Sequence, residues 1–112
     1  MHPHRLRYPP KEPRDPTVPF EMIYADYFKL EGANYLMIGD RLSGWTEIFS
    51  NKGEDSAAGS KGLCRALRRI FATFGVPDDL SSDGGPEFIA GETQEMLKRW
   101  GVNHDPSSAY FL

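Results

Sequence analysis

The sequence predicts one α/β domain in which a three-stranded antiparallel meander is followed by alternating helices and strands. Short segments rich in β-branched and aromatic residues fill the first half, and apolar residues recur at helical spacing after Ser56. A chain of 112 residues with 39% hydrophobic content can bury one modest core. No internal repeat is visible, so the pattern favours a layered sheet-and-helix domain with a mixed sheet.

Three strands are expected in the first half of the chain. Residues 22–28 combine apolar, aromatic and β-branched side chains, and residues 31–34 have the composition of a hairpin connection. A second strand, residues 35–38, should therefore pair antiparallel with the first. Residues 39–44 are typical of a strand end and turn, and residues 45–49 of a third strand.

An amphipathic helix of about four to five turns is expected to begin near Ser56. Gly75 and Pro77 give its stop signal. Its apolar face is formed by Leu63, Leu67, Ile70, Phe71 and Phe74.

The rest of the chain is expected to extend the sheet. Residues 79–83 are predicted to be a short parallel strand, which residues 84–86 interrupt at once. A second helix is predicted from about Gly91 to a stop at Gly101, and residues 102–104 form the next expected strand. The predicted order is β-β-β-α-β-α-β.

Residues 1–19 contain six of the nine prolines, with basic residues between them, which is typical of an extended linker or arm. We therefore divide the chain into an arm, residues 1–19, and a domain, residues 20–112. An interaction module that uses the arm as a ligand is an alternative that rests on composition alone.

Composition excludes several kinds of partner for this chain. No apolar run approaches the length of a membrane span, so we expect an intracellular protein without a membrane partner. Cys64 is the single cysteine, which argues against a disulfide and a structural zinc site; it is expected to be a packing residue, and His2 and His4 have no cysteine partners. The net charge of −3 means that any DNA contact must come from local patches or a metal.

Asp26 and Asp83 are the candidate functional residues. Asp26 lies in an apolar strand on the same alternating face as Met22, Tyr24 and Phe28, where a carboxylate needs a hydrogen bond, an ion pair or a metal. An ordinary strand aspartate bonded to an amide or an arginine remains the alternative. Asp83 is placed where a parallel strand would end, the edge at which open α/β sheets bind ligands, although Ser-Asp-Gly-Gly is also common turn chemistry.

Two carboxylates on neighbouring strands of one sheet can share a divalent cation. Their hard oxygen ligands suit Mg²⁺ or Mn²⁺.

Other polar residues have two interpretations each. Lys61, Arg65 and Arg68 form a helix stripe that could contact DNA phosphates or could simply be the solvated face. Asp40 fits a turn better than a metal site, and His104 fits a strand or loop better than a ligand.

A set of ordered motifs between about residues 19 and 110 resembles the integrase catalytic core of retroviruses and Ty3/gypsy-type retrotransposons. The set is far more specific than any one of its members. It consists of Pro19-Phe20-Glu21 leading to Tyr24-Ala25-Asp26, then Asp40-Arg41-Leu42-Ser43-Gly44-Trp45, Phe74-Gly75-Val76-Pro77 and Ser82-Asp83-Gly84-Gly85-Pro86-Glu87-Phe88.

The resemblance implies an RNase H-like fold and a nuclear enzyme that trims the 3′ ends of element DNA and joins them to target DNA. Asp26 and Asp83 match the first two residues of the family's D,D-35-E triad, whose metal ions, Mg²⁺ or Mn²⁺, would serve an in-line phosphodiester displacement. It also implies DNA as partner, a homo-oligomer, and an arm that joins a preceding zinc-binding domain to the core.

The glutamate of that triad would fall near position 119, past Leu112, so we expect the catalytic core to be incomplete at its C-terminus. Glu87 and Glu92 follow Asp83 too closely to be good substitutes. The alternative function is an inactive remnant or host-adopted module that keeps the fold for binding DNA or protein.

Overall fold

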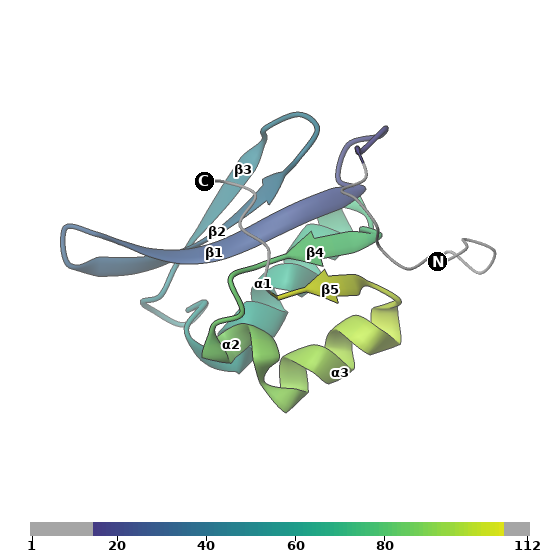
Figure 1. The fold of residues 1–112 in the computed structure, drawn as a ribbon. Helices are drawn as coiled ribbons and strands as arrows, with labels where there is room; N and C mark the ends of the chain where they lie inside the picture. The colour runs from purple at the N-terminus through teal and green to yellow at the C-terminus, as the bar shows by residue number, and fades with distance from the viewer. Residues whose placement is uncertain (1–14, 107–112) are drawn as a thin grey trace.

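A five-stranded mixed sheet organises residues 15–106, the part of the chain that the computed structural model describes (Figure 1). The strand order is β3-β2-β1-β4-β5; β1, β2 and β3 pair antiparallel, and β4 and β5 continue the sheet in parallel with β1. The strands are β1 (Met22–Leu30), β2 (Ala33–Asp40), β3 (Thr46–Ser50), β4 (Asp79–Ser81) and β5 (Asn103–Asp105), and the helices are α1 (Gly59–Phe74), α2 (Pro86–Ile89) and α3 (Gly91–Trp100). The predicted mixed sheet and its parallel extension are confirmed.

The β1–β2 hairpin is tighter than the sequence suggested. Its turn is formed by Glu31 and Gly32 alone, both with positive φ (51° and 83°), whereas Ala33 and Asn34 already pair with β1. Two consecutive residues with positive φ match the twist of the flanking strands, so the hairpin closes with two residues instead of four. The expectation that Asn34 belongs to the connection was therefore wrong.

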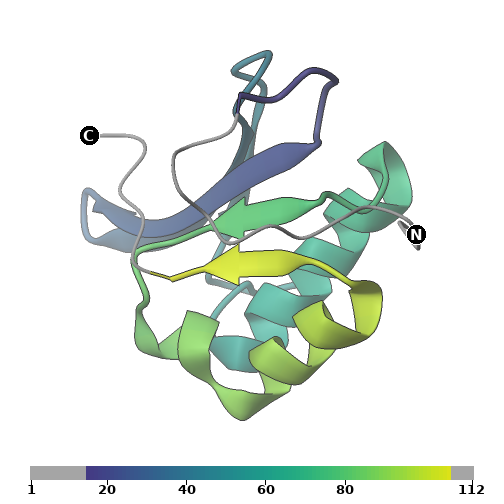
Figure 2. The ribbon, with the colours of Figure 1, turned by 45° about the vertical axis from the view of Figure 1, so that its right-hand side comes forward.

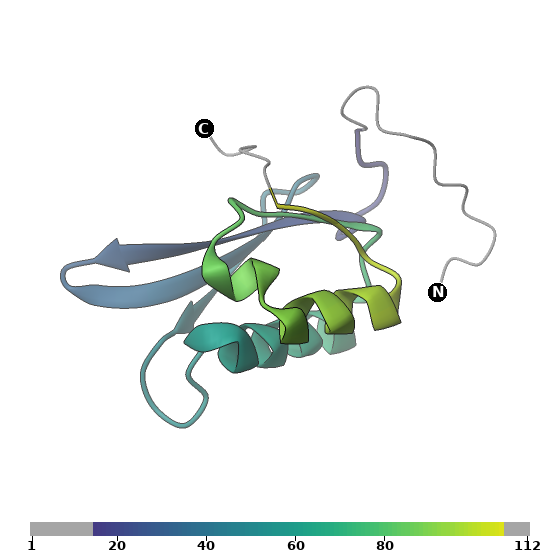
Figure 3. The ribbon, with the colours of Figure 1, turned by 60° about the horizontal axis from the view of Figure 1, so that its bottom comes forward.

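All three helices of the described part lie on one face of the sheet, as Figures 2 and 3 show. Ile23 and Ala25 of β1 face this layer and pack in one core with Leu63 and Leu67 of α1. These four side chains are at most 1% exposed. Because strand side chains alternate, Tyr24 and Asp26 point to the opposite face of the sheet. No helix of residues 15–106 covers that face, which we call the helix-free face.

Helix α1 ends where the sequence predicted. The N–H group of Gly75 bonds the Phe71 carbonyl, and Gly75 has a φ of 99°, a backbone conformation that side chains disfavour. At 16 residues α1 is the longest helix in the described part, and none of its helices is long and apolar enough to cross a bilayer.

Helix α2 was not predicted from the sequence. Residues 84–86 were interpreted as a break, but Pro86 takes the first helical position, where its missing N–H group costs nothing. Phe88 then anchors this single turn in the core at 1% exposure, and the Thr93 hydroxyl of α3 donates to the Glu87 carbonyl at 2.7 Å. Proline often ends a helix or strand, but here Pro86 begins helix α2.

The predicted arm falls mostly outside the described residues, which begin at residue 15. The division at Phe20 therefore stays a prediction. The same holds for His2 and His4, and residues 107–112 also lie outside the description.

Candidate active site

Asp26 lies on the helix-free face of the central strand β1. Its neighbour Ala25 is fully buried in the core on the other face, whereas Asp26 is only partly buried. On the helix-free face Asp26 is opposite Met37 of β2 and lies between Tyr24 and Phe28. The carboxylate is therefore accessible from this side of the sheet.

Asp83 comes to the same level of the sheet from the neighbouring strand. In the parallel pairing of β1 with β4, Tyr24 is opposite Ser81, and Asp26 and Asp83 each follow that pair by two residues. Both therefore lie at the carboxyl end of the pairing, where open α/β sheets bind ligands. Asp83 is exposed although Ser81 and Ser82 before it are buried, so the chain emerges from the sheet at this carboxylate.

The two carboxylates act on each other electrostatically. Burial raises the pKa of Asp26 above its ordinary value, the negative charge of Asp83 raises it further, and a backbone hydrogen bond from Tyr27 lowers it in part. Among residues 15–106 neither carboxylate has an ion pair with lysine or arginine. The negative charge of the pair is thus left without a nearby cation in the described part of the chain.

This pair fits a divalent metal ion. Carboxylate oxygens are the donors that Mg²⁺ and Mn²⁺ prefer, and a cation between the carboxylates would remove the repulsion that raises the pKa of Asp26. Within residues 15–106 no group of three His, Cys, Asp or Glu side chains could hold a metal. The metal-binding role of Asp26 and Asp83 therefore stays a prediction.

We expect Asp83→Asn to lower the pKa of Asp26, because it removes the like charge that raises it. Carbon-detected NMR titration of the metal-free chain measures this directly. Asp55→Asn, in the loop after β3, is the control and should leave the Asp26 titration in place. An unchanged Asp26 pKa in Asp83→Asn would contradict the interaction.

The raised pKa of Asp26 also predicts how the stability of the fold depends on pH. Folded Asp26 keeps its proton to a higher pH than unfolded Asp26, so its contribution to stability is lost as pH rises from about 3.8 through the folded pKa. Asp26→Asn should therefore raise the melting temperature at neutral pH more than at pH 3. A lower melting temperature at neutral pH would contradict this assignment.

The predicted basic stripe lies away from the carboxylates. Lys61, Arg65 and Arg68 are exposed on α1, which packs against the face of the sheet opposite Asp26. Arg65 donates to the Ser56 carbonyl at 2.8 Å, so part of its donor capacity is used locally. The sheet therefore separates the stripe from the acidic pair, and a phosphate-binding role stays a prediction.

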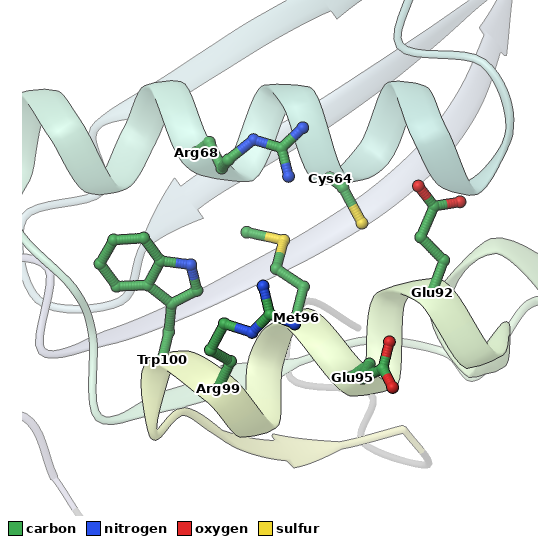
Figure 4. A pocket seen from close by; sticks show the side chains of 7 residues that line it. All are labelled: Cys64, Arg68, Glu92, Glu95, Met96, Arg99 and Trp100. Atoms are coloured by element: carbon green, nitrogen blue, oxygen red, sulfur yellow. The ribbon is translucent and has the colours of Figure 1, made fainter.

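A hollow of about 330 Å³ between α1 and α3 also lies on the helix layer (Figure 4). Its walls are Cys64, Arg68, Glu92, Glu95, Met96, Arg99 and Trp100. Cys64 is 1% exposed, burial raises its pKa, and its sulfur lies 3.8 Å from the Thr93 hydroxyl. The interpretation of Cys64 as a packing residue is confirmed.

Asp40 is a turn residue, as predicted. Its carboxylate accepts hydrogen bonds from the Phe20 amide at 2.7 Å and from the Ser43 amide and hydroxyl at 2.9 and 2.7 Å. Burial alone would raise its pKa, but these bonds outweigh burial and lower it. Asp40 is paired with Ile23, near the start of β1 and three residues before Asp26 along that strand.

Glu87 and Glu92 occupy the helices that follow Asp83. Glu87 lies in α2, and its charge contributes to a raised pKa of Tyr27, after burial. Glu92 lies in the first turn of α3 and accepts a hydrogen bond from Ser60 of α1 at 3.0 Å. Neither forms a three-ligand group with the aspartates in the described residues.

One contact of the site was missed from the sequence. His104, predicted to be a plain strand residue, lies on β5 with its Nε2 atom 3.0 Å from the Ser82 hydroxyl, directly beside Asp83. A single histidine in a short strand gave no signal of this contact, because it depends on the pairing of β4 with β5.

The sheet order, the helices on one face and the carboxylates at the ends of two parallel strands define the class of protein. This architecture is the RNase H-like fold of integrase catalytic cores. The catalytic core domain of HTLV-2 integrase, in complex with magnesium and in a dimeric form, has the same fold: the TM-score is 0.64, with 22% identity over 81% of this chain and 63% of that one.

The sequence matches the same class. The integrase core domain family model matches residues 16–110, and the chain belongs to this family. The chain is 37% identical over 82 residues to the Pol polyprotein of Radiation murine leukemia virus (strain Kaplan), which covers 72% of this chain and 14% of that protein. It is 36% identical over 80 residues to the Gag-Pol polyprotein of Woolly monkey sarcoma virus, covering 70% of this chain and 5% of that protein. The predicted resemblance is confirmed, and the chain spans a small part of these relatives.

Proposed function

We propose that this chain is the catalytic core segment of a retroelement integrase, which trims the 3′ ends of element DNA and joins them to target DNA. The observation that carries the proposal is the pairing of Asp26 with Asp83 on the helix-free face of the sheet, where the charge of one carboxylate raises the pKa of the other. Membership in the integrase core domain family supports the same activity.

In this proposal Asp26 and Asp83 are the protein ligands of Mg²⁺, or of Mn²⁺ in its place. The solved HTLV-2 relative is a complex with magnesium, which supports the choice of metal. When bound, such an ion would polarise the scissile phosphate and activate the attacking hydroxyl. Asp26 lies in the central strand β1, and Asp83 follows the end of β4 by two residues. The sheet therefore fixes the backbone of both carboxylates on its helix-free face.

DNA is the proposed partner, and its phosphate contacts are tested through salt dependence. If Lys61, Arg65 and Arg68 touch phosphates, replacing each with alanine should weaken duplex binding and flatten the log–log salt dependence by about one unit per contact. Fluorescence anisotropy between low and moderate salt measures the slope. Lys52→Ala, an exposed cation after β3, is the matched control. An unchanged slope would assign the stripe to the solvated face.

Two further parts of the proposal rest on the family. The HTLV-2 core is a dimeric form, which supports a homo-oligomer for this chain. An integrase acts on chromosomal DNA, so the proposed location is the nucleus.

The experiment that tests the function is a strand-transfer assay on a labelled duplex, with Mg²⁺ or Mn²⁺. The protein assayed is an extended chain that carries residues 1–112 and a glutamate near position 119. Metal-dependent joining supports the integrase. A folded extended chain that binds the duplex but never joins it would favour the alternative, an inactive module that keeps this fold for binding DNA or protein.

A further inference from the structure

A buried polar contact lies directly behind Asp83. Ser82 is fully buried, and its hydroxyl lies 3.0 Å from Nε2 of His104 on the neighbouring strand β5. Leu80 and its partner His104 face the helix layer, where the His104 ring lies beside Phe88 with 6.3 Å between ring centroids. The contact therefore lies beneath the sheet, on the side opposite the carboxylate pair.

The same hydroxyl also holds the chain after Asp83. The Gly84 amide donates to the Ser82 Oγ atom at 3.2 Å, so Ser82 fixes the residue that follows Asp83. The Gly85 amide in turn donates to Oδ1 of Asp83 at 3.0 Å, which orients the carboxylate itself. A chain of hydrogen bonds thus runs from His104 through Ser82 to the Gly84 backbone.

The end of β5 closes around this segment. The Ser82 amide donates to the Asp105 carbonyl at 3.0 Å. Gly84, with a φ of 78°, lies so close to the Pro106 carbonyl that a Cβ atom would collide with it. Asp83 is therefore exposed between Ser82, which is bonded to β5, and Gly84, which lies against Pro106 just after β5.

The His104 ring is suited to a fixed neutral contact. Burial lowers the pKa of the ring, and the charge of Asp105 only partly offsets this effect, which favours the neutral form. The contact forms in either tautomer, because a hydroxyl both donates and accepts. Removing either partner would leave a buried polar group without its hydrogen bond, which is unfavourable.

We propose that Ser82 and His104 are positioning residues that hold Asp83 opposite Asp26 for metal binding. This inference rests on the proposed function, and it assigns two residues outside the acidic pair to the same site. Replacing a residue that orients a metal ligand through hydrogen bonds changes metal affinity by about 10- to 100-fold.

The test uses the 112-residue chain and two readouts, one of which needs no metal. The variants are Ser82→Ala and His104→Phe, which remove the hydrogen bond, and His104→Gln, whose amide can restore it near the Nε2 position. Amide hydrogen exchange of Gly84 reports the positioning itself. Electron paramagnetic resonance of free Mn²⁺ gives the dissociation constant, and Ser81→Ala, which deletes a buried hydroxyl one residue earlier, is the matched control.

We expect Ser82→Ala and His104→Phe to speed Gly84 exchange and to weaken Mn²⁺ binding about tenfold or more, whereas His104→Gln and Ser81→Ala stay within about threefold of the original chain. Near-ultraviolet circular dichroism shows that each variant is folded. Where Ser82→Ala fails to fold, the His104→Phe and His104→Gln pair carries the test.

Two results would overturn this inference alone. The first is unchanged Gly84 exchange and unchanged Mn²⁺ affinity in Ser82→Ala and His104→Phe. The second is a His104→Gln variant that binds Mn²⁺ as weakly as His104→Phe, which would show that the ring acts by packing and not through its hydrogen bond. In both cases Asp26→Asn and Asp83→Asn still weaken Mn²⁺ binding. Full Mn²⁺ affinity in the two asparagine variants would instead overturn the proposed metal site, and the role of Ser82 and His104 in it.

Discussion

Asp26→Asn and Asp83→Asn should each reduce strand transfer by the extended chain on the order of 10³-fold or more. A metal ion supplies several kcal/mol of transition-state stabilisation, and each 1.36 kcal/mol corresponds to a factor of ten in rate. No group of three His, Cys, Asp or Glu side chains in residues 15–106 could hold a metal. If Asp26 and Asp83 are the ligands, losing either leaves one carboxylate of the pair to hold the ion. An amide also cannot supply the negative charge that neutralises the cation.

The assay is gel separation of joined products on a labelled duplex across a Mg²⁺ series, with Mn²⁺ in parallel. If the defect were only weaker binding of the metal, saturating Mn²⁺ would restore part of the rate. Thermal unfolding separates this loss from misfolding, because Asp26→Asn is expected to be at least as stable as the original chain at neutral pH.

Glu87→Gln and Glu92→Gln are the matched controls. Both remove a carboxylate close in sequence to Asp83, but Glu92 contacts Ser60 on the helix layer and Glu87 lies in the α2 turn. We expect rates within a few-fold of the original. A loss in either control comparable to the aspartate variants would show that the third ligand has been misplaced.

Most of the fold could be predicted because most of its elements have a local signal. The amphipathic period of α1 and the Gly75 stop depend only on neighbouring residues, and so does the alternation of strand β1. The failures are also local: the two-residue turn at Glu31-Gly32 requires a positive φ at a non-glycine residue, and Pro86 was interpreted as ending structure when it begins α2. A proline permits both outcomes, and only the packing of Phe88 decides between them.

Only part of the candidate site could be predicted from the sequence. Asp26 and Asp83 could be chosen because each is a carboxylate in an informative local setting, and the parallel register of β1 with β4 then brings them to one level. The Ser82–His104 contact could not be found in this way, because serine and histidine in short strands have many uses. Which face Asp26 occupies was also hidden, since its flanking residues on both faces are apolar.

The second large effect concerns the length of chain that catalysis needs: residues 1–112 alone should not join DNA with Mg²⁺ or Mn²⁺. Two carboxylates can hold a cation, but fixing metal on both the attacking and the leaving oxygen requires a further rigid ligand. The resemblance to the family puts that ligand, a glutamate, near position 119, and residues 15–106 contain no third metal-binding side chain beside the pair.

A matched pair of chains tests this expectation: residues 1–112, and a longer chain that carries a glutamate near position 119. Strand transfer on a labelled duplex should be undetectable in the first and metal-dependent in the second, and a glutamine at the downstream position should return the long chain to the level of the short one. Added helices would also cover the helix-free face, where Ile48 is 51% exposed, so the extended chain should unfold at a higher temperature. Joining by residues 1–112 that disappears in Asp83→Asn would mean that the pair draws its third ligand from within this chain.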